Sequence, residues 1–373
     1  MLKLLTVFAV SLVLAYISER NTRAIEASGG HYSVRHDWAY IALAVVLILF
    51  AGLRTSYNDT LNYVNGFNQA PGLSQWLFTP ENLNPFKNPL FYFFQSLIKS
   101  CGGQAKHMVF LTAAFTELCF LRFFKRYATS FLFSIYIFFT LGTFVFTLAA
   151  IKQVLAMSVL TMAIPWLERR DLKRFYLLIL VAALFHTYAI IFSLLPLLRA
   201  KPWSLLTFTM IFVVAVIMMN FEEAITAFME QANDLGKTLA DYEVFDDATI
   251  NILRLAVYAV PPVISLICRK WVLYDAQERE HLFIHMSIMS LAFMCMGTQA
   301  GANMFGRMGN YFKLGTICCL PWMLGKIFEE KSCRLVSAVA CICFFGFFFY
   351  ANAINLSFDV EYSAMSIWRF LFS

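Results

Sequence analysis

Three cationic side chains and one histidine stand where the chain passes between apolar and polar sequence. Arg54 ends an apolar run, Lys152 begins one, His186 interrupts one, and Arg307 lies in the polar stretch GTQAGANMFGRMGNYF. Arginine offers phosphate oxygens a planar fork of donors, and lysine offers a mobile point charge. If these residues meet, they could bind an anion and stabilise the charge that develops on a departing phosphate.

Other polar residues accompany these four. Asp59 and His186 are the candidates for a base that takes a proton from an attacking hydroxyl. Each candidate also has a structural interpretation: a single cation at a span end reaches the lipid headgroups, a single histidine packs in the interior, and Asp59 caps a turn or helix. The further candidates for substrate binding are Asn58, Tyr63, Gln153, Asn303 and Tyr311.

The composition indicates which kind of elements position these residues. The chain has 373 residues, of which 60% are hydrophobic and 14% charged, and its mean hydropathy is +0.67. A bilayer span needs roughly 20 apolar residues, and apolar runs recur along the whole length. We therefore expect one transmembrane domain over residues 1–373, with no sizeable soluble domain.

The apolar runs predict an all-α polytopic membrane protein with about 11 to 12 transmembrane helices, including a broken or re-entrant pair. A signal peptide is an alternative for the first run, but Arg20, Arg23 and the lack of a clear cleavage site favour a retained helix. The predicted segments are 2–18, 38–53, 105–122, 129–147, 153–167, 175–198, 203–220, 250–268, 281–300, 308–326 and 334–356.

Charge sets the orientation, because short cytoplasmic links retain lysine and arginine. The net charge of +6 comes from short basic clusters that orient helices, so we expect no nucleic-acid partner. This rule places the loops 54–88 and 221–249 outside. The candidate cations then lie on the outer side, against the rule, which is costly unless they meet an anion. A lipid pyrophosphate would be such a partner.

Counting crossings constrains two segments. Residues 89–99 should form an amphipathic helix on the outer surface, because only one crossing fits between the outer loop and the basic cluster near residue 125. Residues 175–198 should break at His186 into two short arms, a geometry tolerated where backbone groups are buried in protein. One straight helix ending near Pro196 is the alternative.

The sequence offers no metal signature. It has no DxD pair and no HExxH motif, and its nine cysteines lack the spacing of metal ligands. We expect neither a metal nor a cofactor.

Four stretches resemble the EpsG family of bacterial exopolysaccharide polymerases, relatives of the Wzy-type polymerases. They cover roughly a quarter of the chain. The stretches are GLRTSYNDTLNYVNGF (52–67), NPLFYFFQSLIKSCGG (88–103), IKQVLAMSVLTMAIPWLERRDLKRFYLLILVAALFHTYAIIFSLLPLL (151–198) and FGRMGNYF (305–312).

The resemblance implies a glycosyltransferase of the bacterial inner membrane with a GT-C-like fold. It would transfer a growing glycan from undecaprenyl pyrophosphate to the non-reducing end of another lipid-linked repeat unit at the periplasmic face. By resemblance, the family's polar positions fall on Arg54, Asp59, Lys152, Gln153, His186 and Arg307. Lys152 replaces an expected arginine, and Asn88 replaces an expected acid before Pro89.

The leading hypothesis is a polymerase in which Arg54, Lys152 and Arg307 hold the pyrophosphate. Its partners would be undecaprenyl-pyrophosphate-linked oligosaccharides, membrane lipid and a chain-length regulator. A lipid-linked oligosaccharide flippase or other transporter needs polar residues at the bilayer midplane, where Glu117 stands alone. An O-antigen ligase would use similar chemistry. Trp76, Phe78 and Tyr242 are candidates for sugar stacking or for interfacial anchoring.

Overall fold

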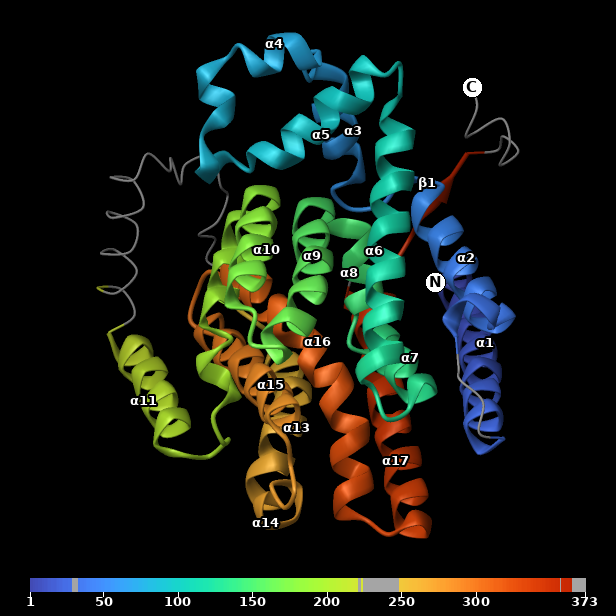
Figure 1. Ribbon diagram of the computed structural model, residues 1–373, viewed down its shortest axis with the longest axis vertical. Helices are drawn as coiled ribbons and strands as arrows, with labels where there is room; N and C mark the ends of the chain where they lie inside the picture. Colours follow the sequence, from blue (N-terminus) through green and yellow to red (C-terminus); the bar gives the residue numbers. More distant parts are fainter. Residues whose placement is uncertain (29–32, 221–222, 224–247, 356, 364–373) are drawn as a thin grey trace. The chain divides into compact units, whose positions relative to one another are not determined.

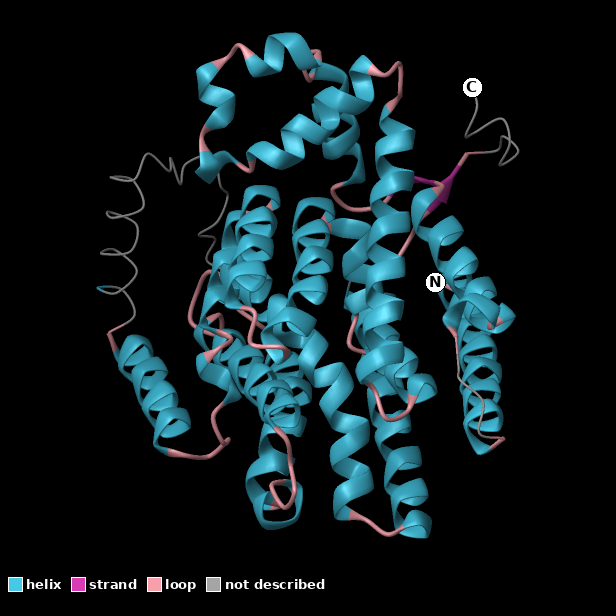
Figure 2. Cartoon of the chain, in the orientation of Figure 1, coloured by secondary structure: helices cyan, strands magenta, loops and turns pink. Residues whose placement is uncertain are grey.

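A computed structural model describes residues 1–28, 33–220, 223, 248–355 and 357–363 (Figures 1 and 2). The described chain is almost entirely helical. Its longer elements are α1 (Leu2–Ala27), α2 (Trp38–Gly52), β1 (Arg54–Ser56), α3 (Thr60–Gln69), α4 (Leu73–Leu77), α5 (Pro89–Ser100), α6 (Ala105–Tyr127), α7 (Phe131–Thr140), α8 (Thr143–Ala149), α9 (Ile151–Glu168), α10 (Leu172–Phe185), α11 (Leu205–Met219), α13 (Ile252–Ile267), α14 (Arg269–Val272), α15 (Glu278–Met296), α16 (Ala302–Ile327), α17 (Glu330–Phe349) and β2 (Glu361–Tyr362).

Short single-turn elements join these helices. The 3₁₀ segments are η1 (Val34–His36), η2 (Pro80–Leu83), η3 (Pro85–Lys87), η4 (Thr187–Leu194) and η5 (Leu197–Arg199), and a π-helical turn, η7 (Tyr350–Asn355), extends α17.

The chain divides into two compact units. Unit 1 contains Met1–Trp166, Leu172–Thr187 and Cys341–Ser373, and unit 2 contains Leu167–Asp171 and Tyr188–Ala340.

The helices identify a multi-pass membrane protein. Within the described residues, three helical segments are long and apolar enough to cross a bilayer: Leu2–Ala27, Ala105–Tyr127 and Glu330–Ile354. The pair α7 and α8 would add a fourth, but it bends by 55°. This count is below the predicted 11 to 12, because several apolar segments form helices of only 10–17 residues. Such helices need tilt or local thinning to cross.

The bend between α7 and α8 corrects the expectation of one continuous segment over 129–147. Gly142 precedes α8 with a φ of 71°, a left-handed conformation that glycine adopts without steric cost. The sequence offers only this single glycine inside an otherwise apolar run.

Aromatic rings fill much of the interior of unit 1. Phe8 of α1 lies 5.0 Å from Phe139 of α7 and 5.4 Å from Phe348 of α17 between ring centroids, and Phe139 lies 4.4 Å from Phe144 of α8. The forty phenylalanines of the chain therefore serve the interior as well as the lipid-facing surface.

A two-stranded antiparallel sheet joins the start of the outer loop to the C-terminal part of unit 1. Arg54 in β1 pairs with Tyr362 in β2, and the Tyr362 hydroxyl donates a 2.9 Å hydrogen bond to the carbonyl of Phe50 (Figure 2). Lys3 also donates to the carbonyl of Val360 at 2.7 Å. This sheet departs from the purely helical fold that the sequence predicts.

Helices α3, α4 and α5 lie beyond the N-terminal end of α6 in Figure 1. As predicted, α5 is a separate helix, and its 12 residues make it about 18 Å long, shorter than the hydrocarbon core. The Lys99 ammonium of α5 donates to the carbonyls of Asn68, at 2.7 Å, and Ala70 at the end of α3. These bonds complement the negative end of α3 and tie α3 to α5.

In unit 2, α15 and α16 pack along each other over many residues. A Cβ atom on Gly315 would lie 2.5 Å from the Cβ of Met286, so glycine allows the two helices to approach. The Ser290 hydroxyl of α15 donates a 3.0 Å hydrogen bond to the carbonyl of Gly309 on α16. Arg307 lies on α16, so the contact between α15 and α16 holds the helix that carries it.

The chain breaks at His186, as the sequence predicts. Helix α10 ends at Phe185, and the 3₁₀ segment η4 begins at Thr187. The Asn88 side-chain oxygen accepts from the backbone N–H of Thr187 at 3.0 Å and from its hydroxyl at 3.3 Å. The segment is therefore not one straight helix.

Candidate functional site

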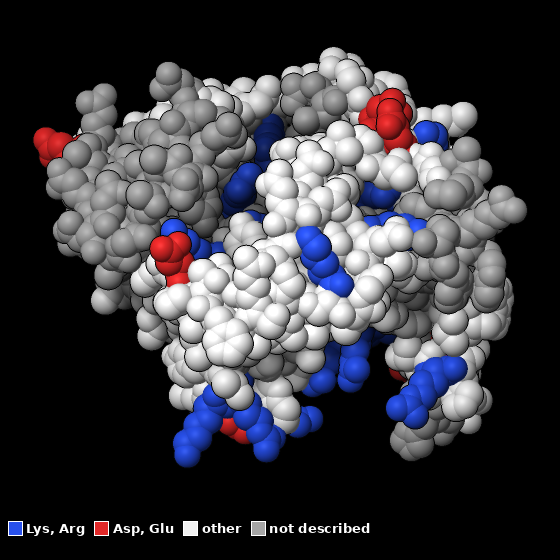
Figure 3. Space-filling model, turned by 90° about the horizontal axis from the view of Figure 1, so that it is seen from above, with Lys and Arg blue, Asp and Glu red and all other residues white. Residues whose placement is uncertain are grey.

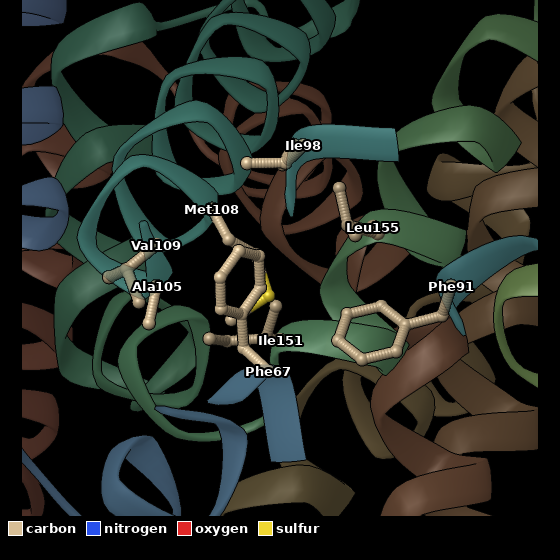
Figure 4. Close-up of a cluster of buried hydrophobic side chains, with 8 residues drawn as sticks. All are labelled: Phe67, Phe91, Ile98, Ala105, Met108, Val109, Ile151 and Leu155. Carbon is tan, nitrogen blue, oxygen red and sulfur yellow. The ribbon is translucent and has the colours of Figure 1, made fainter. Parts of the chain in front are cut away.

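A buried apolar cluster in unit 1 brings several predicted site residues together. It joins α3, α5, α6 and α9 (Figure 4). Tyr63 and Phe185 pack against the cluster. The cluster consists of Phe67, Phe91, Ile98, Ala105, Met108, Val109, Ile151 and Leu155. Two candidates contact this cluster: Tyr63 packs against it from α3, and the Lys152 ammonium lies against the ring of Phe91. His186 follows Phe185 in the chain.

Lys152 is fixed against α5. Its ammonium donates a 2.8 Å hydrogen bond to the hydroxyl of Tyr92 and lies 4.5 Å from the centre of that ring and 5.2 Å from the ring of Phe91. Cation–π contacts of this kind hold a cation at an aromatic surface. The half-buried Lys152 is held at the start of α9, and the neighbouring Gln153 is buried.

Tyr63 reaches the same aromatic pair from α3. Its ring lies 5.8 Å from Phe91 in an edge-to-face arrangement, so Tyr63 and Lys152 contact the same phenylalanine. Sequence reasoning selected Tyr63 and Lys152 but missed Tyr92. The sequence feature that could have identified Tyr92 was its position in PLFYFF, on the helix predicted to lie at the outer surface.

His186 is buried at the end of α10. Its backbone N–H donates to the carbonyl of Ala182 at 3.0 Å, and the next residue, Thr187, is held by Asn88. Asn88 has a left-handed φ of 53°, a conformation that asparagine tolerates better than most residues. Asn88 stands where the family resemblance leads us to expect an acid. Its side-chain oxygen accepts the hydrogen bonds from Thr187 that a carboxylate would accept, and these bonds hold the chain at the break beside His186.

Arg54 is buried, with 2% of its surface exposed. Its Nε donates to the Thr60 hydroxyl at 3.1 Å, and its Nη1 donates to the carbonyl of Ala51. Burial lowers the pKa of Arg54 to about 10, opposed by the charges of Tyr362, Glu117, Tyr63 and Tyr57. The guanidinium therefore remains cationic at neutral pH.

Asp59 and Asn58 form the turn between β1 and α3. Asp59 occupies the capping position of α3, but its carboxylate makes no capping hydrogen bond. Asn58 is exposed with a φ of 45°. The carboxylate of Asp59 is only partly exposed. Its role as a base stays a prediction.

Sequence reasoning gave Glu117 no role at the site. Glu117 lies inside α6 with 0% of its surface exposed, and it accepts a 2.8 Å hydrogen bond from the Thr147 hydroxyl. The sequence feature that could have drawn attention to Glu117 was a carboxyl group within an apolar span.

The remaining predicted residues lie in unit 2, on α16. Arg307 is half-buried, Asn303 is exposed, and Tyr311 is fully buried with its ring 6.2 Å from Phe192. Arg54, Lys152 and His186 belong to unit 1. The convergence of all four residues in one pocket therefore stays a prediction.

Unit 2 also contains a group of cations that sequence reasoning missed. Lys313 has 2% of its surface exposed, and its ammonium lies 5.1 Å from the ring centre of Tyr258. The Arg254 guanidinium lies 5.9 Å from the same ring. Two helices, α13 and α16, thus place cations on one buried phenol. Lys313 follows Arg307 on α16 at a spacing of six residues.

The candidates for sugar stacking differ in exposure. Trp76 is buried and packs edge-to-face on Phe93 at 5.4 Å, so it serves the α4–α5 contact rather than an open sugar surface. Phe78 is 87% exposed. Tyr242 lies outside the described residues.

A cavity of about 310 Å³ lies in unit 2, and its lining includes none of the predicted site residues. It is lined by Leu167, Glu168, Arg199, Gln277, Glu278, Arg279 and Leu282. Its arginines are engaged, since Arg199 pairs with Glu278 and Arg279 with Glu280.

The charged surface is sparse. On the face shown in Figure 3, lysine and arginine atoms form several small groups among uncharged atoms rather than one continuous patch. Within the described ranges, no three His, Cys, Asp or Glu side chains are grouped as metal ligands would be.

A comparison with protein families decides the identity of the chain. The profile of the EpsG family matches residues 37–364, which include all four stretches named above. The chain belongs to the EpsG family. EpsG is a family of Wzy-like polysaccharide polymerases, which gives this member a general role in polysaccharide polymerisation. Searches of curated proteins and of solved structures gave no match.

Proposed function

We propose that this EpsG-family protein polymerises lipid-linked oligosaccharide repeat units at the periplasmic face of the bacterial inner membrane. It transfers the growing glycan from undecaprenyl pyrophosphate to the non-reducing end of another lipid-linked unit. The observation that carries this proposal is the arrangement in unit 1, where Lys152 and Tyr63 contact the ring of Phe91 in one apolar cluster. Membership of a polymerase family supports the reaction class.

The reaction needs charge stabilisation and one proton transfer. The bond between the anomeric carbon and the diphosphate oxygen breaks, and the diphosphate leaves with the electron pair. The acceptor hydroxyl forms the new glycosidic bond and gives its proton to His186 or Asp59. Lys152, Arg54 and Arg307 are the cations that we propose to stabilise the departing diphosphate.

Cations take the place of a metal in this proposal, because they supply the positive charge that the departing diphosphate requires. The GT-C-like fold and a chain-length regulator as partner are parts of the same proposal. Asn58, Gln153, Asn303 and Tyr311 would shape the substrate cleft.

A reconstitution experiment tests the function. Purified protein in lipid vesicles receives one undecaprenyl-pyrophosphate-linked repeat unit, and the products are separated by size. A ladder of longer glycans supports the polymerase. Product that forms only after a second acceptor lipid is added indicates a ligase. Movement of intact substrate between leaflets without a ladder indicates a flippase, and both outcomes contradict the proposal.

A further inference from the structure

Unit 2 contains two cations and a phenol that the proposed chemistry does not use. They are Arg254 and Tyr258 on α13 and Lys313 on α16, and we call them the α13–α16 cation group. The Lys313 ammonium lies 5.1 Å from the ring centre of Tyr258, and the Arg254 guanidinium carbon lies 5.9 Å from it. Two side chains of the same charge are thus held at one ring, where their charges repel each other.

Backbone hydrogen bonds hold the starts of the two helices together. The N–H of Ile250, two residues before α13, donates to the carbonyl of Gly297 at 2.8 Å. The N–H of Ala302, the first residue of α16, donates to the carbonyl of Ala248 at 3.0 Å. Arg254 stands in the first turn of α13, beside these bonds. The cation group is therefore built into the packed structure of unit 2.

The group is covered, but the described residues do not balance it. Lys313 has 2% and Tyr258 has 4% of its surface exposed, whereas Arg254 is half-buried. No hydrogen bond ends on the Tyr258 hydroxyl within the described part of unit 2, although both cations act on it electrostatically. Among the same residues Arg254 forms no ion pair. A bound anion would compensate both the covered hydroxyl and the guanidinium charge.

The donors of the group define the chemistry of its ligand. An ammonium, a guanidinium and a phenol all donate hydrogen bonds, and the two charged groups are donors only. Such donors bind phosphate oxygens, and a guanidinium can bind two of them at once. Arg254 is the half-exposed member, so an anion would reach the group from its side. The proposed reaction supplies this ligand chemistry twice, because the donor lipid and the acceptor lipid each carry a diphosphate.

The two diphosphates need different surroundings. The donor diphosphate leaves at the reacting carbon, near the base, and both base candidates, His186 and Asp59, belong to unit 1 together with Arg54 and Lys152. The acceptor diphosphate stays bonded to its sugar throughout, because the acceptor reacts at its other end. Its site therefore only has to hold charge. The cation group of unit 2 offers charge and a hydroxyl donor without either base candidate.

We propose that the α13–α16 cation group binds the diphosphate of the acceptor lipid, while Arg54 and Lys152 in unit 1 serve the donor. The binding groups are the guanidinium of Arg254, the ammonium of Lys313 and the hydroxyl of Tyr258. This inference rests on the proposed function. No bond of the acceptor diphosphate forms or breaks at this site.

Direct binding tests the site without any reaction. The probe is a repeat unit on the undecaprenyl diphosphate carrier in which a methylene group replaces the oxygen between sugar and diphosphate, so that it can accept a glycan but cannot donate one. Its affinity is measured for purified protein that carries Arg54→Gln, which weakens the proposed donor site. Added Arg254→Gln or Lys313→Met should each lower this affinity about tenfold, because each removes one charged contact to phosphate.

Matched variants show whether charge at this position matters. Arg254→Lys should retain most of the affinity, and Tyr258→Phe should lose less than the two charge removals, because it deletes only the hydroxyl. Lys326→Met removes an exposed lysine from the last turn of the same helix and should leave the affinity unchanged. Binding of undecaprenol, which has no phosphate, should be the same in all variants. An unchanged probe affinity in folded Arg254→Gln and Lys313→Met would overturn the inference.

The unfolding temperature separates a binding site from a structural contact. If the group only packed the helices together, each variant would lower the unfolding temperature of ligand-free protein. In an anion site the empty group is a cost, so Tyr258→Phe and Lys313→Met should leave this temperature unchanged or raise it, while the increase caused by the probe becomes smaller. If Lys313→Met does not fold, the half-exposed Arg254 carries the test. A lower unfolding temperature with unchanged probe affinity would contradict the proposal.

A single-transfer assay separates the acceptor from the donor. The donor is a lipid-linked glycan that lacks its accepting hydroxyl, and the acceptor is the probe. Arg254→Gln should raise the KM for the acceptor about tenfold and leave the KM for the donor unchanged. A rise confined to the donor KM would overturn the inference.

The proposed function can fail separately. If the parent protein forms no glycosidic bond in this assay but binds the probe with the losses described above, the site for lipid diphosphates remains and the polymerase proposal falls. If product forms with normal KM values in the Arg254 and Lys313 variants, the polymerase proposal stands and the inference falls.

Discussion

The Lys152 ammonium donates a 2.8 Å hydrogen bond to the Tyr92 hydroxyl, and this bond joins the start of α9 to α5. A flexible cation is thereby held in one place before any substrate arrives. Preorganised charge of this kind stabilises a transition state without reorganisation at the moment of reaction.

Lys152 should act through its charge as well as its position. Lys152→Met should lower polymerisation at least about tenfold, whereas Lys152→Arg should retain most activity, since a guanidinium keeps the charge and offers a fork. Tyr92→Phe keeps the ring and loses only the hydrogen bond, so its effect should be smaller. Glycan ladders from vesicles with equal amounts of protein measure all three. Equal activity of Lys152→Met and Lys152→Arg would remove Lys152 from the phosphate site.

Asn88 should be replaceable by aspartate but not by alanine. Aspartate keeps the oxygen that accepts from Thr187 and tolerates a left-handed backbone, whereas alanine loses both. Asn88→Ala should lower the free energy of unfolding by about 1–3 kcal/mol and reduce activity by displacing His186. Asn88→Gly separates the two causes, because it keeps the backbone freedom and loses the oxygen. Thermal unfolding in detergent would contradict this account if Asn88→Ala matched the parent protein.

The two-stranded sheet should be needed for Arg54. Tyr362→Phe removes the hydrogen bond to the Phe50 carbonyl and should cost about 1 kcal/mol. Deleting residues 357–373 removes β2 altogether and should abolish polymerisation even where the protein is still inserted in the membrane. Activity close to normal in the deletion would show that β1 holds Arg54 without its partner strand.

The α15–α16 contact gives a prediction about stability alone. In Gly315→Ala, the new methyl group meets the Met286 Cβ at 2.5 Å and the Phe283 carbonyl oxygen at 3.1 Å, so we expect a loss of about 1–3 kcal/mol. Gly325→Ala is the matched control on the same helix, because no atom lies within 4 Å of its added Cβ. Its unfolding temperature should be unchanged or slightly higher. Equal unfolding temperatures for the two variants would refute the close approach.

Local patterns predicted the helices and some of the site. The break at His186 follows from two apolar arms that are each too short to cross, and the separate α5 follows from charge parity. The bend at Gly142 was missed because residues on both sides are equally apolar. The pairing of Arg54 with Tyr362 was missed because the two strands are two and three residues long and lie far apart in sequence.

For the site, too, properties of single positions could be predicted from the sequence, whereas contacts between distant segments could not. Lys152 and His186 were selected because charge at an outer helix end breaks an orientation rule, a property of one position. Tyr92 acquires meaning only from Lys152, a residue on another helix, and nothing in the sequence near Tyr92 specifies that contact.

The bonds from Lys99 to the end of α3 make α3 and α5 one mechanical piece of unit 1. Because a single ammonium holds the carbonyls of Asn68 and Ala70, movement of either helix alone has to break these bonds. Any rearrangement of this part of the protein therefore favours joint movement of α3 and α5.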